Sequence, residues 1–187
     1  MSIAGFLDDQ RANFVLRWHA RQTVRRETLA EHHFVVTRIA LIVADALHYY
    51  TLAYPDIATV LLYALFHDAA EVETSDVSAE AKKLYPSLRE AVELAESEVI
   101  DHVLFSGLPD WFAERYRGFA RSLVLPLDTV EQQVVRYADK VAALKFAETE
   151  LAIGNTLMRD AVVSIHAEIR DLDWPWLVQL RKETGLP

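Results

Sequence analysis

The amino-acid sequence contains no cysteine. This absence excludes disulfide bonds, a thiolate nucleophile and zinc or iron–sulfur sites with cysteine ligands, so any metal ion must be held by nitrogen and oxygen atoms. Glycine and proline are also scarce, with five and six residues, and no stretch shows the sustained alternation of apolar and polar residues that is typical of strands. The sequence therefore predicts an all-α fold.

Long apolar runs and an excess of positive charge are also absent. The longest apolar runs, at residues 39–44 and 57–66, are shorter than the roughly 20 residues that cross a bilayer, and the first residues do not resemble a secretory signal. The formal net charge of -9 argues against binding a nucleic acid polymer or an anionic membrane through long-range electrostatics. We expect a cytoplasmic protein that attracts any anionic ligand through a bound cation or a few local arginines.

The size and composition suit one globular domain. The chain has 187 residues, of which 52% are hydrophobic and 25% are charged, and such a chain can bury a sufficient core. No repeat, low-complexity tract or long linker divides it. We therefore expect residues 1–187 to form a single domain.

Two residue pairs have the spacing of a helix capping box, Thr28 with Glu31 and Thr129 with Gln132. In this motif each side chain satisfies the exposed backbone N–H of the other residue, so both pairs predict helix starts. The two helices are expected to end near residues 53 and 154. Apolar periodicity predicts further helices at residues 3–18, 57–72, 87–105, 110–122, 158–169 and 174–182, with a loop and a short helix at 73–83.

Three segments place ionisable residues where packing alone would favour apolar ones. In the first, His32 shares a predicted helix face with Val35, Val36 and Ile39, so its imidazole is expected to point inward. A buried histidine with a hydrogen-bond partner is common. Taken alone, His32 is better interpreted as such a core residue than as a ligand.

In the second segment, His67, Asp68 and Glu71 end the most apolar predicted helix. Burying an unpaired carboxylate costs several kcal/mol, so Asp68 needs a cation or strong hydrogen bonds. Glu71 is expected one helical turn beyond His67, close enough to act on whatever His67 holds. The alternative is a helix end that frays into solvent.

In the third segment, Asp139 lies on the stripe formed by Val135, Ala142 and Phe146. For this residue alone, a buried pair with an arginine and a role in metal binding explain the pattern equally well. The three segments together favour a metal, because two imidazoles and two carboxylates suit a divalent ion whose charge the carboxylates balance. Further coordination positions could hold water and a substrate oxygen.

Read in order, the proposed ligands form an H…HD…D signature, and the chain resembles the HD-domain phosphohydrolases. A more specific resemblance, over roughly residues 10–155, is to the YfbR-type 5'-deoxynucleotidases. It is carried by Arg17-Trp18 and by residues 26–32, 67–76 and 138–155. The resemblance implies a single-domain HD-domain helical bundle with one divalent metal ion held by His32, His67, Asp68 and Asp139.

The resemblance also implies roles for the neighbouring residues. Glu71 would assist the attacking water, and Asp76 would place the water or the leaving sugar oxygen. Arg17 would bind the phosphate, and Trp18 would lie against the sugar or base. Lys82, after the active-site loop, is a further candidate for contacting the phosphate. Without the resemblance, Arg17 is better interpreted as the ion-pair partner of Glu27 or Glu31, and Trp18 as a core aromatic at a helix end.

The function implied by the resemblance is removal of the 5'-phosphate from deoxynucleoside monophosphates by a homodimeric enzyme. The ligand set suits Co²⁺, Mn²⁺, Zn²⁺, Fe²⁺ or Mg²⁺ and does not select one of them. One alternative is a dNTP triphosphohydrolase that releases triphosphate. A non-enzymatic alternative is a module that binds a nucleotide and regulates a partner without turnover.

The sequence departs from the family pattern at positions that bear on the substrate. His33 stands where a small hydroxyl residue is usual, Ala20 is smaller than the usual residue, and the expected prolines are missing after Asp76. We therefore expect a pocket that differs from that of the family, and the role of His33 stays open. The other histidines are expected on the surface: His19, His48, His102 and His166.

Overall fold

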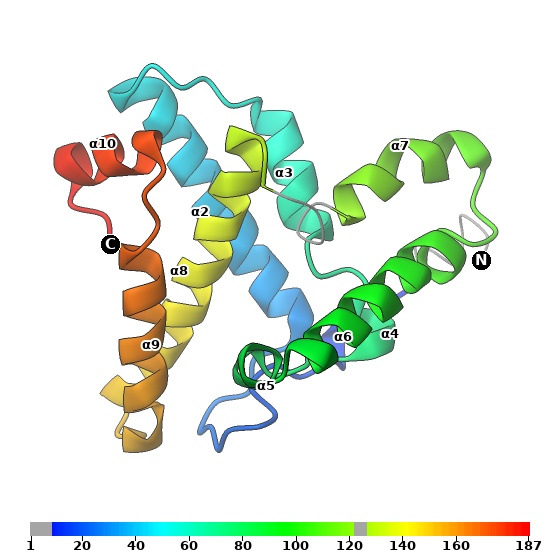
Figure 1. The fold of residues 1–187 in the computed structure, drawn as a ribbon, viewed down its shortest axis with the longest axis horizontal. Helices are drawn as coiled ribbons and strands as arrows, with labels where there is room; N and C mark the ends of the chain where they lie inside the picture. Colours follow the sequence, from blue (N-terminus) through cyan, green and yellow to red (C-terminus); the bar gives the residue numbers. More distant parts are fainter. Residues whose placement is uncertain (1–8, 122–126) are drawn as a thin grey trace. The chain divides into compact units, whose positions relative to one another are not determined.

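The computed structural model describes residues 9–121 and 127–187 (Figure 1). Within these ranges the regular structure is helical, apart from one isolated antiparallel bridge between Leu16 and Thr28. The prediction of an all-α fold is confirmed. In the same part of the chain, no helix combines the length and the apolar character needed to span a membrane.

The described residues form two compact units. The first consists of residues 9–22, 26–33 and 66–121, and the second of residues 23–25, 34–65 and 127–187. Each unit has its own cluster of buried apolar side chains. Both units combine segments that are distant in the sequence, so a boundary between them could not be read from composition or from a linker.

The first unit is built mainly from short helices. Figure 1 shows the longest of them, α6, with α5 beside it and with α7 after the turn that follows. An aromatic group fills the core of this unit, where the ring of Phe66 lies 6.1 Å from that of Phe105 and 5.8 Å from that of Tyr116. The elements are the 3-10 turn η1 (Arg11–Asn13), the first turn of α2, α4 (Glu71–Thr74), α5 (Ala79–Leu84), α6 (Pro86–Val99), the π-helical turn η2 (Ile100–Leu104) and α7 (Asp110–Ala120).

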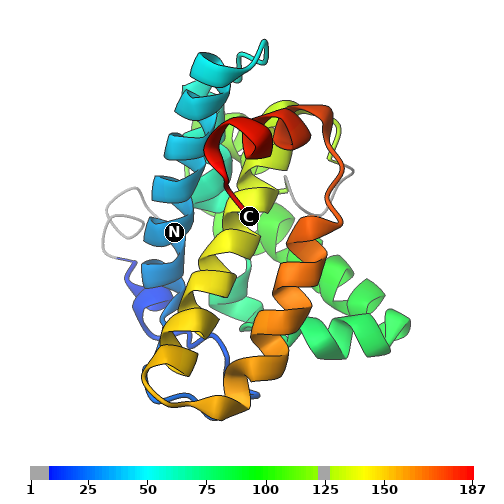
Figure 2. The same ribbon diagram turned by 90° about the vertical axis from the view of Figure 1, so that its left-hand side faces the viewer.

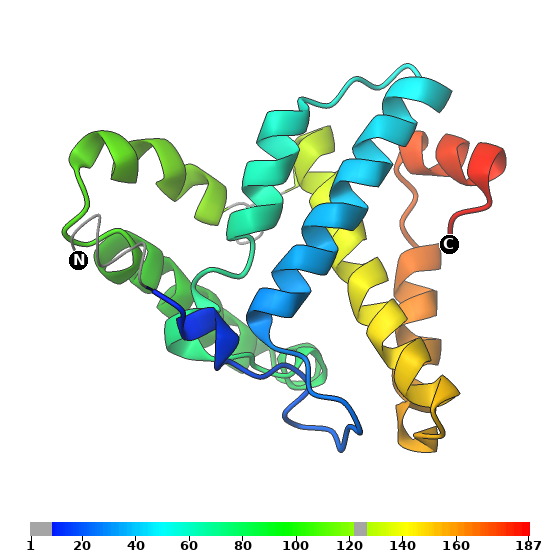
Figure 3. The same cartoon turned by 180° about the vertical axis from the view of Figure 1, so that it is seen from behind.

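The second unit contains the long helices. Figure 2 shows α8 and α9 side by side, and Figure 3 shows α3 alongside α2. Their apolar faces meet in a core that includes Val36, Leu47, Val60, Leu144 and Leu177. The elements are α2 (Leu29–Tyr50), α3 (Ile57–Phe66), α8 (Val130–Ala152), the 3-10 turn η3 (Thr156–Met158), α9 (Arg159–Arg170) and α10 (Pro175–Thr184).

Both capping boxes are present. The backbone N–H of Thr28 donates to Glu31 Oε2 at 2.8 Å, and the N–H of Glu31 donates to Thr28 Oγ1 at 3.2 Å. Thr129 and Gln132 make the equivalent pair of bonds at the start of α8. The predicted starts of these two helices are confirmed, because capping depends on neighbouring residues alone.

The helix predicted at residues 3–18 is wrong for the part that the structure describes, and residues 3–8 lie outside the described residues. After the single turn η1, the chain is extended and pairs with the segment before α2. The N–H of Arg17 donates to the carbonyl of Glu27, and the N–H of Leu29 donates to the carbonyl of Val15, both at 2.9 Å. These long-range bonds replace the bonds that a helix would make.

The helix predicted at residues 57–72 ends earlier, at Phe66. Residues 67–70 form a turn, in which the N–H of Ala69 donates to the carbonyl of Phe66 and the N–H of Glu71 to that of Asp68. A new helix, α4, begins at Glu71. The expected placement of Glu71 one continuous helical turn beyond His67 is therefore wrong, and the His-Asp pair lies in the turn between two helices.

Candidate metal centre

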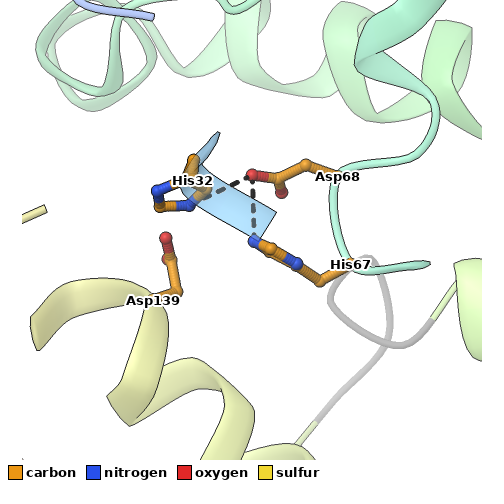
Figure 4. A group of neighbouring side chains, drawn as sticks. All are labelled: His32, His67, Asp68 and Asp139. Carbon is orange, nitrogen blue, oxygen red and sulfur yellow. Dashed lines mark ion pairs between the residues drawn. The ribbon is translucent and has the colours of Figure 1, made fainter. Parts of the chain in front are cut away.

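Three of the predicted metal ligands lie together in the first unit. The Nε2 atom of His67 is 3.2 Å from Asp68 Oδ2, and the Nε2 atom of His32 is 3.8 Å from the same oxygen. One ligand atom of each residue lies within 4.8 Å of those of the other two. Figure 4 shows these side chains pointing toward one another and draws Asp139 with them. The structure thus brings together two imidazoles and one carboxylate from segments that are distant in the sequence.

The local structure fixes the directions of these ligands. His32 lies in the first turn of α2, directly after the capping box, and its side chain is fully buried. His67 and Asp68 lie in the turn between α3 and α4, and His67 is 6% exposed. Because the turn is not helical, His67 and Asp68 can both point toward His32, which consecutive residues of one helix could not do.

The donor set fits a divalent metal ion. Imidazole nitrogen and carboxylate oxygen bind such ions at about 2.0–2.2 Å, which places ligand atoms about 3–4 Å from one another. The distances of 3.2 and 3.8 Å between the imidazole nitrogens and Asp68 lie in this range. Burial favours the neutral form of Asp68, but the neighbouring His67, then Arg17 and His32, hold its pKa well below the usual value. Asp68 is therefore ionised, as a metal ligand must be.

Asp139 lies on α8, in the second unit. Its neighbours on the predicted stripe, Val135, Ala142 and Phe146, are buried as expected, and Asp139 itself is half-buried. Its role as the fourth ligand stays a prediction.

Arg17 lies among carboxylates of the same unit. Its Nη1 atom donates to Asp68 Oδ2 at 3.0 Å and lies 3.6 Å from Glu71 Oε2, and its Nε atom lies 3.8 Å from Glu27 Oε2. The alternative that Arg17 pairs with Glu27 is thus correct, although Asp68 is its shorter contact. Glu31 instead serves the capping box. A guanidinium in this position can contact a phosphate next to a metal held by Asp68.

Glu71 is a buried carboxyl group at the start of α4, with 6% of its surface exposed. Burial, and then the negative charge of Asp68, raise its pKa to about 9, although Arg17 acts in the opposite direction. Carboxyl groups with strongly raised pKa values are frequent at catalytic sites, and a pKa of about 9 leaves Glu71 protonated at pH 7 when no cation lies beside it. The position and environment of Glu71 suit the role that the resemblance implied.

Trp18 is held at two points. Its backbone N–H donates to Asp76 Oδ2 at 3.2 Å, and its indole N–H donates to Glu27 Oε2 at 2.9 Å. The φ angle of Trp18 is 61°, a left-handed conformation that is uncommon for a bulky side chain and requires support from its surroundings. Asp76 therefore fixes the backbone of Trp18, and Glu27 fixes the ring that the resemblance placed against the sugar or base.

Glu27 is a residue whose importance the sequence analysis missed. It is 7% exposed, and besides contacting Arg17 and Trp18 it places its Oε1 atom 4.0 Å from Nδ1 of His32. A carboxylate beside the second nitrogen of a metal-binding imidazole orients that ring. Glu27 precedes α2 in an extended segment, where no helical periodicity marks it as buried.

His33 packs against the candidate ligands. The centroid of its ring lies 4.9 Å from that of His67 and 6.4 Å from that of His32. Burial, and then the neighbouring His67, lower its pKa to about 3, so its imidazole is neutral at pH 7. His33 thus packs beside the candidate ligands, and the expectation that the pocket differs here from that of the family stays a prediction.

Lys82 lies on α5, in the first unit, and is half-buried. Its positive charge acts to lower the pKa of Glu71. It does the same for Glu96 of α6, whose pKa is raised by burial. The sequence analysis did not identify Glu96, because α6 carries many other acidic residues. The four remaining histidines, at positions 19, 48, 102 and 166, are exposed as expected.

Glu150, near the end of α8, is one of the residues that carry the resemblance to the family, and it has a structural role. It is fully buried in the second unit and accepts hydrogen bonds from the backbone N–H groups of Val24 at 2.7 Å and Arg25 at 2.8 Å. Asn155 Nδ2 donates to it at 2.9 Å. Burial favours the neutral acid, but these bonds hold its pKa below the usual value. Glu150 thus anchors residues 23–25.

The chain is similar to known proteins over most of its length. A family model described as 5'-deoxynucleotidase YfbR-like matches residues 8–183. The 5'-deoxynucleotidase VV1113 of Vibrio vulnificus is 28% identical over 147 residues, which cover 78% of this chain and 73% of the relative.

Solved structures show the same fold. An HD-domain phosphohydrolase of Listeria innocua superposes with a TM-score of 0.78 at 20% identity, over 98% of this chain and 87% of that one. The HD phosphohydrolase DatZ of cyanophage S-2L, solved with dA and one catalytic Zn²⁺ ion, superposes with a TM-score of 0.67 at 20% identity, over 98% and 94% of the two chains. The match of the family model confirms the resemblance seen in the sequence, and the chain belongs to the YfbR-like 5'-deoxynucleotidase family.

Proposed function

We propose that the protein is a metal-dependent phosphohydrolase that removes the 5'-phosphate from deoxynucleoside monophosphates. The observation that carries the proposal is the convergence of His32, His67 and Asp68 beside the buried Glu71 and Arg17, in a chain of this family. Its relatives in Vibrio vulnificus and Pasteurella multocida are named 5'-deoxynucleotidases, which supports removal of a 5'-phosphate as the reaction. The nucleoside and zinc ion described for DatZ support a nucleotide and a metal as the two ligands of this fold.

One divalent ion would be held by His32, His67, Asp68 and Asp139. When bound, it supplies a Lewis acid for a phosphoryl oxygen and lowers the pKa of a coordinated water. Two imidazoles and two carboxylates suit Zn²⁺, Co²⁺, Mn²⁺ and Fe²⁺, and Mg²⁺ less well because it prefers oxygen ligands. Zinc is our choice for the first test, since it is the ion described for DatZ.

Glu71 is the proposed base for the attacking water. The positive charge of a bound divalent ion would lower the pKa of Glu71 and favour its ionised form. That carboxylate would accept a proton as the water oxygen bonds to phosphorus and the bond from phosphorus to the 5'-oxygen breaks. The departing 5'-oxygen then takes up a proton. Asp76, which the N–H of Trp18 holds in place, would position this oxygen. General acid–base catalysis of this kind contributes about 10²–10⁴-fold to a rate.

Arg17 binds the phosphate in this account. Negative charge on the phosphoryl oxygens grows in the transition state, and a fixed guanidinium stabilises it. Arg17 already lies next to Asp68 and Glu71, so it reaches the phosphate by exchanging one carboxylate contact for a phosphate contact. Trp18 would pack against the sugar or base, and Lys82 would add a second positive charge.

The test is phosphate release from a panel of dNMPs, NMPs and dNTPs by purified protein loaded with Zn²⁺, Co²⁺ or Mn²⁺. We expect orthophosphate from dNMPs, and a loss of at least about 100-fold in kcat for Glu71→Gln at unchanged metal content. Glu73→Gln, on the exposed side of α4, is the matched control and should keep full activity. Triphosphate release from dNTPs alone, or turnover of no nucleotide by metal-loaded protein, would contradict the proposal.

The homodimer that the resemblance implies is not required by this mechanism. Every residue of the proposed site comes from one chain, so the reaction itself predicts no oligomeric state.

A further inference from the structure

His19 is an exposed histidine that lies beside Asp76. Its Nδ1 atom is 4.0 Å from Oδ2 of Asp76, and 51% of the His19 side chain is exposed, compared with 15% of the Asp76 side chain. Both residues belong to the first unit, although they are distant in the sequence. The sequence analysis expected His19 on the surface and gave it no function. The structure thus puts an imidazole next to a carboxylate that the proposed mechanism uses.

The two carboxylate oxygens of Asp76 have different surroundings. Oδ2 accepts the backbone N–H of Trp18 at 3.2 Å, and it is also the oxygen that faces Nδ1 of His19. Oδ1 accepts no hydrogen bond from the part of the chain that the structure describes. Burial raises the pKa of Glu71 to about 9, and the negative charges of Asp68 and then Asp76 add to this shift, so Asp76 lies near the proposed base. Oδ1 is therefore the oxygen that is available to a bound nucleotide.

The backbone presents both members of the pair in an uncommon way. In the ranges 9–121 and 127–187, the non-glycine residues with positive φ are Trp18, at 61°, and Ser75, at 63°. Trp18 directly precedes His19, and Ser75 directly precedes Asp76. The φ of Ser75 is combined with a ψ of 163°, which is rare for residues other than glycine. Such conformations persist only where the surroundings support them, and they cluster at functional sites.

We propose that His19 is a positioning residue, whose Nδ1–H donates to Oδ2 of Asp76 and keeps Oδ1 of that carboxylate directed at the bound nucleotide. The distance of 4.0 Å exceeds that of a hydrogen bond by about 1 Å, and rotation of the exposed His19 side chain closes this gap. The proposal rests on the proposed function, because the nucleotide is the ligand that Asp76 contacts in the proposed reaction.

A second donor matters because one hydrogen bond does not fix a carboxylate. With the N–H of Trp18 alone, Asp76 can turn about its Cβ–Cγ bond and exchange its two oxygens, since this torsion is broad. A second donor on Oδ2, from another direction, removes this freedom. Misplacement of a contacting group by about 1 Å can lower a rate by about 100-fold, so we expect loss of the exposed second donor to lower it by about tenfold.

The first test measures kcat and KM for dNMPs with metal-loaded protein. His19→Ala should lower kcat about tenfold and leave KM and metal content unchanged, because the binding groups and the ligands are intact. His19→Asn should recover most of the loss, since its amide nitrogen is as many bonds from Cβ as Nδ1 is. His19→Gln places its amide nitrogen one bond farther away and should not recover it.

Two further variants separate positioning from a general structural effect. In an Asp76→Ala background, His19→Ala should cause no additional loss of kcat, because His19 acts through Asp76. His102→Ala, at an exposed site on η2 of the same unit, is the matched control and should keep wild-type kcat and KM. Circular dichroism should show unchanged folding for every variant of His19, since its side chain is exposed.

The second test does not depend on turnover. Nitrogen-15 NMR of the His19 imidazole shows which ring nitrogen carries the proton when Zn²⁺-loaded protein is measured at about pH 8, where neutral histidine predominates. The signals are assigned by their loss in His19→Ala. A carboxylate can only accept, so it selects the Nδ1–H tautomer. We expect this tautomer in wild type and loss of the preference in Asp76→Ala.

An Nε2–H tautomer in wild type, an unchanged kcat in His19→Ala, or equal activities of the Asn and Gln variants would overturn the proposal. Each of these results is distinct from a failure of the proposed function, in which wild-type protein itself hydrolyses no dNMP.

Discussion

Arg17 donates a hydrogen bond of 3.0 Å from Nη1 to Oδ2 of Asp68. The residue expected to bind phosphate is thus in contact with a residue expected to bind metal. A phosphate oxygen that reached both Arg17 and an ion held by Asp68 would have its charge neutralised from two sides. This adjacency is the physical basis of the predictions for the site.

Arg17→Ala should raise the KM for dNMPs and lower kcat, with a combined loss of about 10²–10³-fold in kcat/KM, because a donor that stabilises phosphoryl charge is lost. Metal content, measured by mass spectrometry of the dialysed protein, should not fall, since Arg17 is not a ligand. Arg21→Ala, which removes the ion pair with Glu80, is the control. Loss of the metal in Arg17→Ala would contradict the assigned role.

Glu27→Gln should weaken metal binding about tenfold, because residues that orient a metal-binding imidazole typically affect affinity by 10–100-fold. The indole of Trp18 should also lose its charged acceptor, so tryptophan fluorescence should shift. Competition with a chelator measures the affinity, and Glu98→Gln on the exposed side of α6 serves as the control. An unchanged metal affinity together with normal folding would show that Glu27 does not act through His32.

Glu150→Ala should destabilise the protein by about 2–4 kcal/mol at pH 7, because it leaves the N–H groups of Val24 and Arg25 and the amide of Asn155 without their acceptor. Urea unfolding measures the difference from wild type. Glu183→Ala at the exposed end of α10 should have little effect.

The buried carboxylate of Glu150 also predicts a pH dependence of stability. The pKa of Glu150 in the folded protein is below its ordinary value of 4.5, so the folded state binds its proton less readily than the unfolded state. The stabilisation is therefore complete well above pH 4.5 and declines as the pH falls through that value. The difference between wild type and Glu150→Gln should shrink in the same window. A difference that grew on acidification would contradict the assignment.

The sequence predicted the features that depend on neighbouring residues. Both capping boxes, at Thr28 and Thr129, were identified correctly, and so was the inward direction of His32. The end of α3 at Phe66 was missed, because Ala69, Ala70 and Val72 continue the apolar pattern and the turn that interrupts it depends on tertiary contacts.

Long-range pairing explains the other errors. Residues 9–18 include apolar positions that suit a helix, but this segment pairs with residues 27–29 instead. The contact of Glu27 with Trp18 depends on that pairing, which brings the two segments together. A single sequence contains no local signal for such contacts. The metal ligands could be identified nevertheless, because the family motif is defined by the order of residues along the chain.

The most direct test of the account is the number of metal ions bound per chain. Purified protein loaded with Zn²⁺ and dialysed should contain one ion per chain by mass spectrometry. Single substitutions His32→Ala, His67→Ala, Asp68→Ala and Asp139→Ala should each remove most of it, whereas Asp45→Ala on the exposed face of α2 should keep it. Full occupancy in the Asp139→Ala variant, or no stable binding by wild type, would contradict the four-ligand site from which the proposed reaction follows.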